Sequence, residues 1–399
     1  MTGTEPEAFP FRLLPEDYGT PTRLYDRGGG GLAPIRLPSG DLARLVMGYA
    51  DVERVLRDRR FSRNFRYPGA PRLTAVDDMS ANPDAIVNLD PPEHSRLRRT
   101  VQGAFRPGNA SQWRPAVQRT VGGLLDAVAA AGPPADLVAS FARLLPIRVI
   151  CELMDVPGPD QAALIGWTGI FFATSAVTAD ERADAGTAFV AYLHQLVASR
   201  RAAPGSGLVD ELIRACDVAG TLSQDELYQM IAALFIGGQE NTSAILARGI
   251  LTLLRHRDQY AALAADPGLI PAAVEEILRY EVASEGAFLR VTTQDVELSA
   301  GVVPAGNAVQ VSLPAANRDA GRFADPDRFD IRRTPNPHLT FGAGAHFCVG
   351  APLARLELAA GLEAVVTRFP ALALARPLAD LRYSQDSLVR ALLELPVTW

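Results

Sequence analysis

A cysteine in a glycine-rich loop is the residue of this chain whose surroundings most clearly indicate chemistry. Cys348 lies in residues 341–350, a stretch with three glycines and almost no charge. Glycines let a backbone turn tightly and pass close to a flat ligand. Pro352 then suits the first turn of a helix, so we expect Cys348 just before a helix N-terminus, where free N–H groups and the helix dipole favour a thiolate. A thiolate held in such a loop can be the axial ligand of a haem iron.

Two other roles for Cys348 are open on the residues alone. An isolated cysteine in a turn is most often a buried structural residue. A zinc site shared with His346 is a second alternative, but only Cys151 and Cys216 remain as partners and the chain has no Cys-x-x-Cys pair. The fixed spacing across the whole loop favours the haem ligand over both.

The pattern Phe-Gly-x-Gly-x-His-x-Cys-x-Gly, filled at residues 341–350, resembles the haem-binding loop of the cytochrome P-450 superfamily in its bacterial, actinomycete-like form. The resemblance implies haem b bound through the thiolate of Cys348, which favours O–O cleavage. It also implies a mainly α (α+β) fold, with a large helical lobe, a smaller β-rich lobe and the haem between them. Residues 31–399 are expected to form this single domain after an extended N-terminal segment, residues 1–30. The cofactor contacts implied in the loop are Phe341, His346, Cys348 and Gly350.

His94 and Arg98 follow a double proline that can start a helix. Their spacing of four residues places both on one helix face. Two donors on one face suit carboxylates such as the propionates of haem, and a solvated basic helix start is the alternative. The resemblance favours the propionate role and extends it to Arg290 and His346.

A long helical pattern runs from residue 224 to about residue 256 and opens with a capping box, Ser223 and Glu226. At about 1.5 Å per residue it is a rod of roughly 50 Å. Its middle contains Gly237 and Gly238, and a glycine inside a helix costs about 1 kcal/mol relative to alanine. We expect these two glycines to allow close approach of the cofactor and a kink.

This rod resembles the distal helix of the cytochromes P-450, in which a glycine pair is followed by an acid and a threonine that deliver protons during oxygen activation. Glu240 fits the acid, but Asn241 stands where the threonine is expected. Thr242 comes one position late, about 100° round the helix. The predicted catalytic residues are therefore Glu240, Asn241 and Thr242, with a water held by Asn241 or a substrate hydroxyl as the replacement for the usual threonine.

Glu276 and Arg279 lie three residues apart on a predicted helix and can form a bidentate pair. Glu-x-x-Arg alone is too common to be informative, but Arg328 in a downstream Pro-Asp-Arg-Phe supplies a second arginine. The resemblance implies that Glu276, Arg279 and Arg328 form a buried structural triad behind the haem.

The substrate pocket is determined least by the sequence. Glu285 is either a solvated surface residue or a pocket residue that favours a basic or hydrogen-bond-donating substrate. Phe171 and Phe172 suit a substrate roof and a plain core equally. The residues predicted to line the pocket are Phe171, Phe172, Phe235, Ser284, Glu285, Ala287 and Leu388.

Composition excludes several classes of function. Hydrophobic residues make up 48% and charged residues 21% of the chain, as in a globular enzyme, and the net charge of −6 gives no reason to expect nucleic acid. The chain contains no lysine, which excludes a Walker-type phosphate site and a pyridoxal Schiff base. Without a disulfide framework, a signal peptide or a long apolar run, a soluble cytoplasmic protein without a membrane anchor is expected.

The residues and the resemblance together predict a monomeric haem-thiolate monooxygenase that hydroxylates or epoxidises a small-molecule natural-product intermediate, free or tethered to a carrier protein. Electrons are expected from a separate ferredoxin or flavodoxin, with Arg96, Arg99, Arg106 and Arg355 as candidates for its docking face. Asn241 motivates one alternative, oxidative cyclisation or C–C or C–N coupling without oxygen insertion. A haem sensor or electron carrier without catalysis is the alternative from another class.

Overall fold

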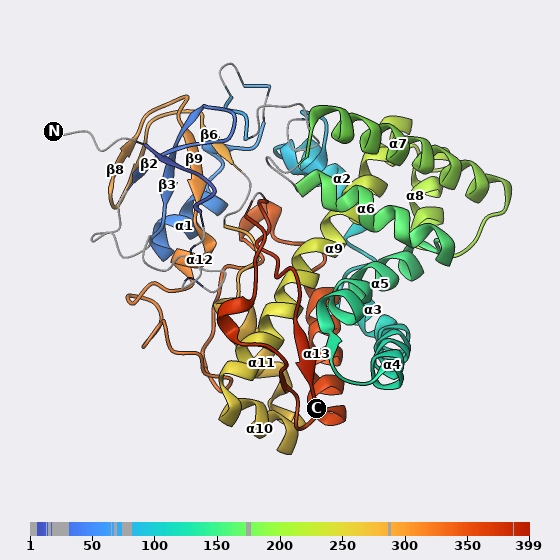
Figure 1. Cartoon of the computed structure of the whole chain (residues 1–399). Coiled ribbons are helices and arrows are strands. Elements are labelled where there is room, and N and C mark those ends of the chain that lie inside the picture. Colours follow the sequence, from blue (N-terminus) through green and yellow to red (C-terminus); the bar gives the residue numbers. More distant parts are fainter. Residues whose placement is uncertain are drawn as a thin grey trace.

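A large helical lobe and a smaller β-rich lobe make up the chain (Figure 1), as the resemblance predicted. The computed structural model describes residues 6–12, 14, 17, 32–64, 66–67, 70–73, 82–172, 177–285, 289–385 and 387–399, with the side chains of residues 110, 111, 171 and 172 left out. Within these ranges, no helix combines the length and the apolar character needed to cross a membrane.

The β-rich lobe is organised by a six-stranded sheet of order β1-β2-β3-β9-β6-β4. Its strands are β1 (Glu7–Ala8), β2 (Ala33–Arg36), β3 (Leu42–Val46), β4 (Phe61–Ser62), β6 (Arg290–Thr292) and β9 (Ala308–Val311). Phe9 and Phe11 are buried against β2 and β3, so the described part of the N-terminal segment packs onto this lobe. The short helices α1 (Tyr49–Arg57) and α12 (Leu313–Ala316) share a second apolar cluster with the sheet.

Two smaller sheets complete the strands. One pairs β7 (Val296–Leu298) with β8 (Gly301–Val303), and the other has the order β10-β11-β5, with β10 (Ala373–Leu374), β11 (Pro396–Thr398) and β5 (Ala135–Asp136).

The helical lobe is built round α9 (Gln224–Arg255), which is buried along most of its length and crosses the middle of the molecule (Figure 1). The predicted capping box is present, because Ser223 N donates to Glu226 at 2.8 Å and Glu226 N donates to Ser223 Oγ at 3.2 Å. The other helices are α2 (Glu93–Val101), α3 (Pro107–Ala110), α4 (Arg114–Ala131), α5 (Leu144–Met154), α6 (Gln161–Phe172), α7 (Ala179–Ala202), α8 (Leu208–Asp217), α10 (Arg257–Ala265), α11 (Ile270–Tyr280) and α13 (Ala351–Arg368).

A fully buried carboxylate on α11 organises the chain that leads to Cys348. Glu276 pairs with Arg279 at 2.8 Å, as predicted, and both side chains are 0% exposed. The second arginine, however, is Arg333, whose Nε lies 3.2 Å from Glu276. The prediction of Arg328 was wrong: its side chain is 69% exposed beside Asp330, and only its carbonyl oxygen joins the cluster by accepting from Arg279.

This correction generates a test with a matched control. Arg333→Met should lower the free energy of unfolding by about 3 kcal/mol, because breaking a buried pair leaves the Glu276 charge partly uncompensated. Arg328→Met should cost less than about 1 kcal/mol, since exposed pairs contribute little. Denaturant midpoints of the two variants measure the difference, and equal midpoints would contradict the assignment of Arg333.

Candidate functional site

The Cys348 loop is held against the β-rich lobe by a glycine that no other residue can replace. Gly342 and Gly344 both have φ of +71°, in the left-handed region that favours glycine. A Cβ on Gly344 would lie 2.6 Å from the carbonyl oxygen of Leu56, at the end of α1. The loop closes on itself where Cys348 N donates to the carbonyl oxygen of Phe341 at 2.9 Å. As predicted, the helix that follows, α13, has Pro352 in its first turn.

A second carboxylate on α11 clamps both ends of the loop. Glu275 lies 3.1 Å from Nε2 of His338, ahead of the loop, and accepts from Nε of Arg355 on α13 at 2.6 Å. The Arg355 guanidinium lies over the Phe341 ring, with its carbon 4.6 Å from the ring centroid. The loop is therefore fixed by charge on both sides of the cysteine.

The Cys348 thiol is accessible, yet its surroundings favour the neutral form. Desolvation raises the pKa of the thiol, while the N–H groups of Gly350 and Ala351 and the guanidiniums of Arg98 and Arg355 lower it. The helix N-terminus thus acts in the predicted direction, but desolvation outweighs it. A metal ion bound at the sulfur would hold it as the thiolate.

Helix α2 brings its predicted face to this loop. Arg98 Nη2 donates to the carbonyl oxygen of Phe347 at 2.6 Å, next to the cysteine. The His94 and His346 rings are in contact, with centroids 4.2 Å apart and planes tilted by 43°. The structure thus brings together His94, Arg98 and His346 from two segments about 250 residues apart in sequence.

Two buried arginines from the β-rich lobe add positive charge to the same place. Desolvation lowers the pKa of Arg290 to about 10 and, together with the charge of Arg290, also lowers the pKa of Arg63. Desolvation and the neighbouring cations lower the pKa of His346 to about 2, and that of His94 to about 4. Nδ1 of His94 and Nε2 of His346 are buried without a hydrogen-bond partner among the described residues.

Such a cluster fits an anionic ligand with carboxylates. Burial away from water is the largest cause of each lowered pKa, and neighbouring cations add to it at His346. Charge-assisted hydrogen bonds to carboxylates would offset both effects. A thiol suited to iron beside the same cluster matches the two kinds of group on a haem, so the residues present fit this cofactor.

The burial of α9 is interrupted in its middle, around Gly237. Gly237 is exposed and a Cβ there would meet nothing within 4 Å, which leaves room beside the helix. Gly238 has a different reason from the predicted one: a Cβ there would lie 3.3 Å from Cγ1 of Ile150, so this glycine lets α5 approach α9. Gly237 therefore leaves open space beside the helix, and Gly238 allows close helix packing.

The three polar residues after the glycines differ in environment. Glu240 is half-buried, and desolvation raises the pKa of its carboxyl, opposed by the charge of Arg143. Asn241 is also half-buried, whereas Thr242 is only 7% exposed. Glu240 and Asn241 thus border the open stretch of α9, and Thr242 faces the packed side.

The predicted substrate-pocket residues lie in different environments. Phe235 is 0% exposed and its ring meets Phe189 edge to face, which places it in the helical core. Glu285 is not a surface residue, because it is 2% exposed and pairs with Arg390. Ser284 and Leu388 are half-buried. Ala287 and the side chains of Phe171 and Phe172 lie outside the described residues.

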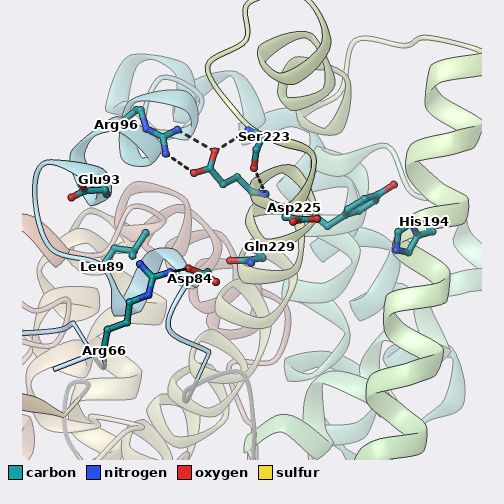
Figure 2. A pocket seen from close by; sticks show the side chains of 11 residues that line it. Arg66, Asp84, Leu89, Glu93, Arg96, His194, Ser223, Asp225 and Gln229 are labelled. Atoms are coloured by element: carbon teal, nitrogen blue, oxygen red, sulfur yellow. Dashed lines mark hydrogen bonds and ion pairs between the residues drawn. The ribbon is translucent and has the colours of Figure 1, made fainter. Parts of the chain in front are cut away.

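Two of the four arginines predicted for partner docking are occupied within the chain. Arg355 is held by Glu275, and Arg96 donates to Glu226 at 3.1 Å at the start of α9 (Figure 2). This pair borders a cavity of about 540 Å³ between the segment before α2, helix α7 and the first turns of α9. None of the predicted pocket residues lines that cavity.

Sequence reasoning missed two residues of the site and its support. Arg63 follows the short strand β4 and reaches the site only because β4 pairs with β6, which carries Arg290. Arg333 adjoins Arg332, and no local pattern distinguishes the one that turns inward.

Comparisons with known proteins identify the family to which the chain belongs. The family described as cytochrome P-450 matches residues 268–376. The mycinamicin IV hydroxylase/epoxidase of Micromonospora griseorubida and the nocardicin C N-oxygenase of Nocardia uniformis subsp. tsuyamanensis are each 41% identical over 409 residues, covering all of both chains. The crystal structure of SgvP, described as a candidate thioether synthase in the tailoring of griseoviridin, matches with a TM-score of 0.93 and 38% identity over 99% of this chain and 100% of that one.

The clamp on the loop has a pH dependence that can be measured. Desolvation alone would raise the pKa of Glu275, but hydrogen bonds from His338 and Arg355 lower it from 4.5 to about 2. A carboxyl with a lower pKa in the folded state stabilises the fold above its ordinary pKa, and this contribution is lost as the pH falls toward the folded value.

Glu275 is 31% and Arg355 37% exposed, so solvent screening reduces the effect. Between about pH 6 and pH 3, the wild-type protein should lose about 1 kcal/mol more stability than Glu275→Gln. Thermal unfolding at each pH measures this, with Glu53→Gln, from an exposed pair with Arg57, as the control expected to follow the wild type. Parallel pH profiles for wild type and Glu275→Gln would contradict the clamp.

Proposed function

The chain belongs to the cytochrome P-450 family as a monooxygenase with a haem-iron cofactor, and we propose that it hydroxylates or epoxidises a small-molecule intermediate of natural-product biosynthesis. The observation that carries this proposal is the convergence of the accessible Cys348 thiol with a buried cluster of cations and imidazoles. The relatives named as hydroxylase/epoxidase and N-oxygenase support the reaction class.

The cofactor we propose is haem b, with Cys348 as its iron ligand. Activation of dioxygen at the haem, aided by electron donation from a thiolate, is the chemistry that this cofactor supplies when bound. His94, Arg98, Arg290 and His346 would neutralise its propionates, and Arg63 adds to the same charge. Phe341 and Gly350 would flank it on the loop side, and the open space at Gly237 would accommodate it on the side of α9.

Protons would be delivered from α9. Glu240 borders the open stretch, and a carboxyl with a raised pKa holds a proton more readily at neutral pH, as a general acid must. The Asn241 amide can orient a water between this carboxyl and the substrate. Thr242 is buried on another face, so we assign it no direct part.

A second reaction, oxidative cyclisation or coupling without oxygen insertion, is favoured by one specific observation. Asn241 has no hydroxyl at the position that the family uses for proton delivery, and coupling makes smaller demands on that delivery. The overall likeness to SgvP supports keeping this candidate. The relatives are oxygenases, and nothing in the site favours a non-catalytic sensor or carrier.

The electron donor we propose is a separate ferredoxin or flavodoxin. Of the four arginines predicted to dock it, Arg99 and Arg106 are the stronger candidates, because Arg96 and Arg355 are held by carboxylates of this chain. We keep a monomeric cytoplasmic protein and a free or carrier-tethered substrate as parts of the proposal.

Turnover under isotopically labelled dioxygen, with substrate candidates and redox partners, tests the reaction. One labelled oxygen atom in the product is expected, and its absence in a turned-over product would favour coupling instead. Cys348→Ser should abolish the red-shifted absorption of the reduced carbon monoxide complex and reduce turnover at least about 100-fold, a loss of about 2.7 kcal/mol of transition-state stabilisation. Persistence of that band would show that another residue binds the iron.

Asn241→Thr tests proton delivery directly. Restoring a hydroxyl should change the ratio of product formed to peroxide released by about threefold or more, since it changes the donor nearest the reacting oxygen. Thr242→Val, one position later on the buried face, is the control and should leave that ratio unchanged. Identical ratios in wild type and Asn241→Thr would remove Asn241 from the mechanism.

A further inference from the structure

Two buried ion pairs meet where two turns of the chain approach α9. Arg248 on α9 pairs with Glu281 at 2.7 Å, and Arg390 pairs with Glu285 at 2.8 Å. All four residues are at most 4% exposed. The two carboxylates come from the turn after α11, residues 281–285. Arg390 lies in a second turn, of which residues 383–385 and 387–391 are described.

The two pairs form one network through main-chain oxygens. Arg248 Nη1 donates to the carbonyl oxygens of Val282 at 3.2 Å and Arg390 at 3.3 Å. Arg390 N donates to the carbonyl oxygen of Ala283 at 2.8 Å, and Ser284 bridges Val389 in antiparallel pairing. A single guanidinium of α9 therefore contacts both turns at once.

The network also reaches the far end of the chain. Arg390 Nη2 donates to the carbonyl oxygen of Phe11 at 2.8 Å, so the described N-terminal segment is attached to the same arginine. On α9, Thr252 Oγ1 donates to Glu281 at 2.5 Å, one turn beyond Arg248.

The register of α9 places this network beside the site. Arg248 follows Asn241 by seven residues, which is about two helical turns, so the two share one face and lie about 10 Å apart along the axis. Gly237 falls on the same face. One face of α9 thus carries Gly237 beside the open space, then Asn241, and finally Arg248, whose guanidinium contacts the two turns.

Stability alone does not explain such an arrangement. A buried ion pair is often no more stabilising than apolar residues of the same volume, and what it supplies is a fixed geometry with a penalty for any other. Here the fixed geometry is that of two turns relative to the helix that carries Glu240 and Asn241.

We propose that Arg248, Glu281, Glu285 and Arg390 act as one unit that positions the turn of residues 281–285 and the described part of the second turn on the substrate side of the site, and so determines which bulky ligands fit. Glu285 is a positioning residue in this scheme, because its carboxylate is engaged by Arg390 instead of selecting a basic substrate. The inference rests on the proposed function and on the predicted pocket residues Ser284 and Leu388, which would place these two turns beside the cofactor.

The test uses two azoles that bind haem iron through nitrogen and differ in size. Purified haem-containing protein is titrated with imidazole, which reports access to the iron, and with clotrimazole, which fills a large space, and the shift of the Soret band is followed. Glu285→Gln should weaken clotrimazole binding about tenfold, because the ligand must then order turns that the ion pair no longer holds. Imidazole binding should change less than about twofold.

A double-mutant cycle distinguishes one unit from two separate pairs. Arg248→Gln should reproduce the effect of Glu285→Gln, and the double variant should remain near tenfold instead of approaching a hundredfold. Tyr260→Phe is the control for general destabilisation, because it removes a buried hydrogen bond to Phe369 at 2.7 Å far from these turns. It should leave the ratio of the two dissociation constants unchanged.

A variant that does not fold leaves a second route open. Glu285→Leu combined with Arg390→Met removes both charges of the pair together, so neither is left buried opposite a neutral partner, and the variant is expected to fold. It also lacks the ion pair and should show the same selective loss of clotrimazole binding. Unchanged clotrimazole binding, equal losses for both azoles, or multiplying effects in the double variant would each overturn the proposal. Wild-type protein that shows no Soret shift with either azole would instead overturn the haem-thiolate assignment, and this inference with it.

Discussion

Charge removed from water is the constraint on which the architecture around Cys348 depends. Helix α11 carries two adjacent carboxylates that point to different partners: Glu276 inward to Arg279 and Arg333, and Glu275 to His338 and Arg355. One tethers the segment that leads into the loop, and the other clamps the loop itself. In both places the buried or half-buried charges are matched within the chain, which is the usual condition for burying them. The cluster at His94, His346 and their neighbouring arginines is different, since burial and nearby positive charge both lower the pKa values of its imidazoles. The carboxylates of the proposed cofactor would suit such a cluster.

The position of the thiol follows from a steric limit and an electrostatic one. Gly344 allows the loop to approach the carbonyl oxygen of Leu56 more closely than any Cβ permits, and Arg98 ties the carbonyl oxygen of Phe347 to α2. The sulfur is thus placed by contacts from both lobes before any metal is considered. Desolvation raises the pKa of the thiol despite nearby donors, so binding of iron at the sulfur would have to drive its deprotonation.

What the sequence could predict depended on whether the signal was local. The capping box of Ser223 and Glu226, the pairing of Glu276 with Arg279 and the shared face of His94 and Arg98 are all set by spacings of three or four residues, and each is present. The identity of the third member of the Glu276 cluster depended on how an irregular segment folds, so Arg328 was chosen where Arg333 lies. We expected Gly238 to make room for a ligand, but its neighbour is Ile150. The residue spacing within α5 or α9 alone does not reveal that the two helices pack closely at this point. The choice between surface and pocket for Glu285 stayed open because its partner, Arg390, is more than a hundred residues away in the sequence.

The distal side of the site joins two of these observations. Replacing a hydroxyl by the Asn241 amide on α9 removes a group that can both donate and relay a proton, so the relay has to pass through a water or through the substrate itself. Either route works only if the substrate lies in one orientation, since proton transfer needs heavy atoms within about 3 Å of each other. In the arrangement we propose, the network that fixes two turns to the same face of α9 as Asn241 would supply that orientation from the protein side. The missing hydroxyl and the buried ion pairs are therefore complementary in this proposal. Because α9 contributes less to proton transfer, the reaction would depend more on the two turns that Arg248 and Arg390 hold in place.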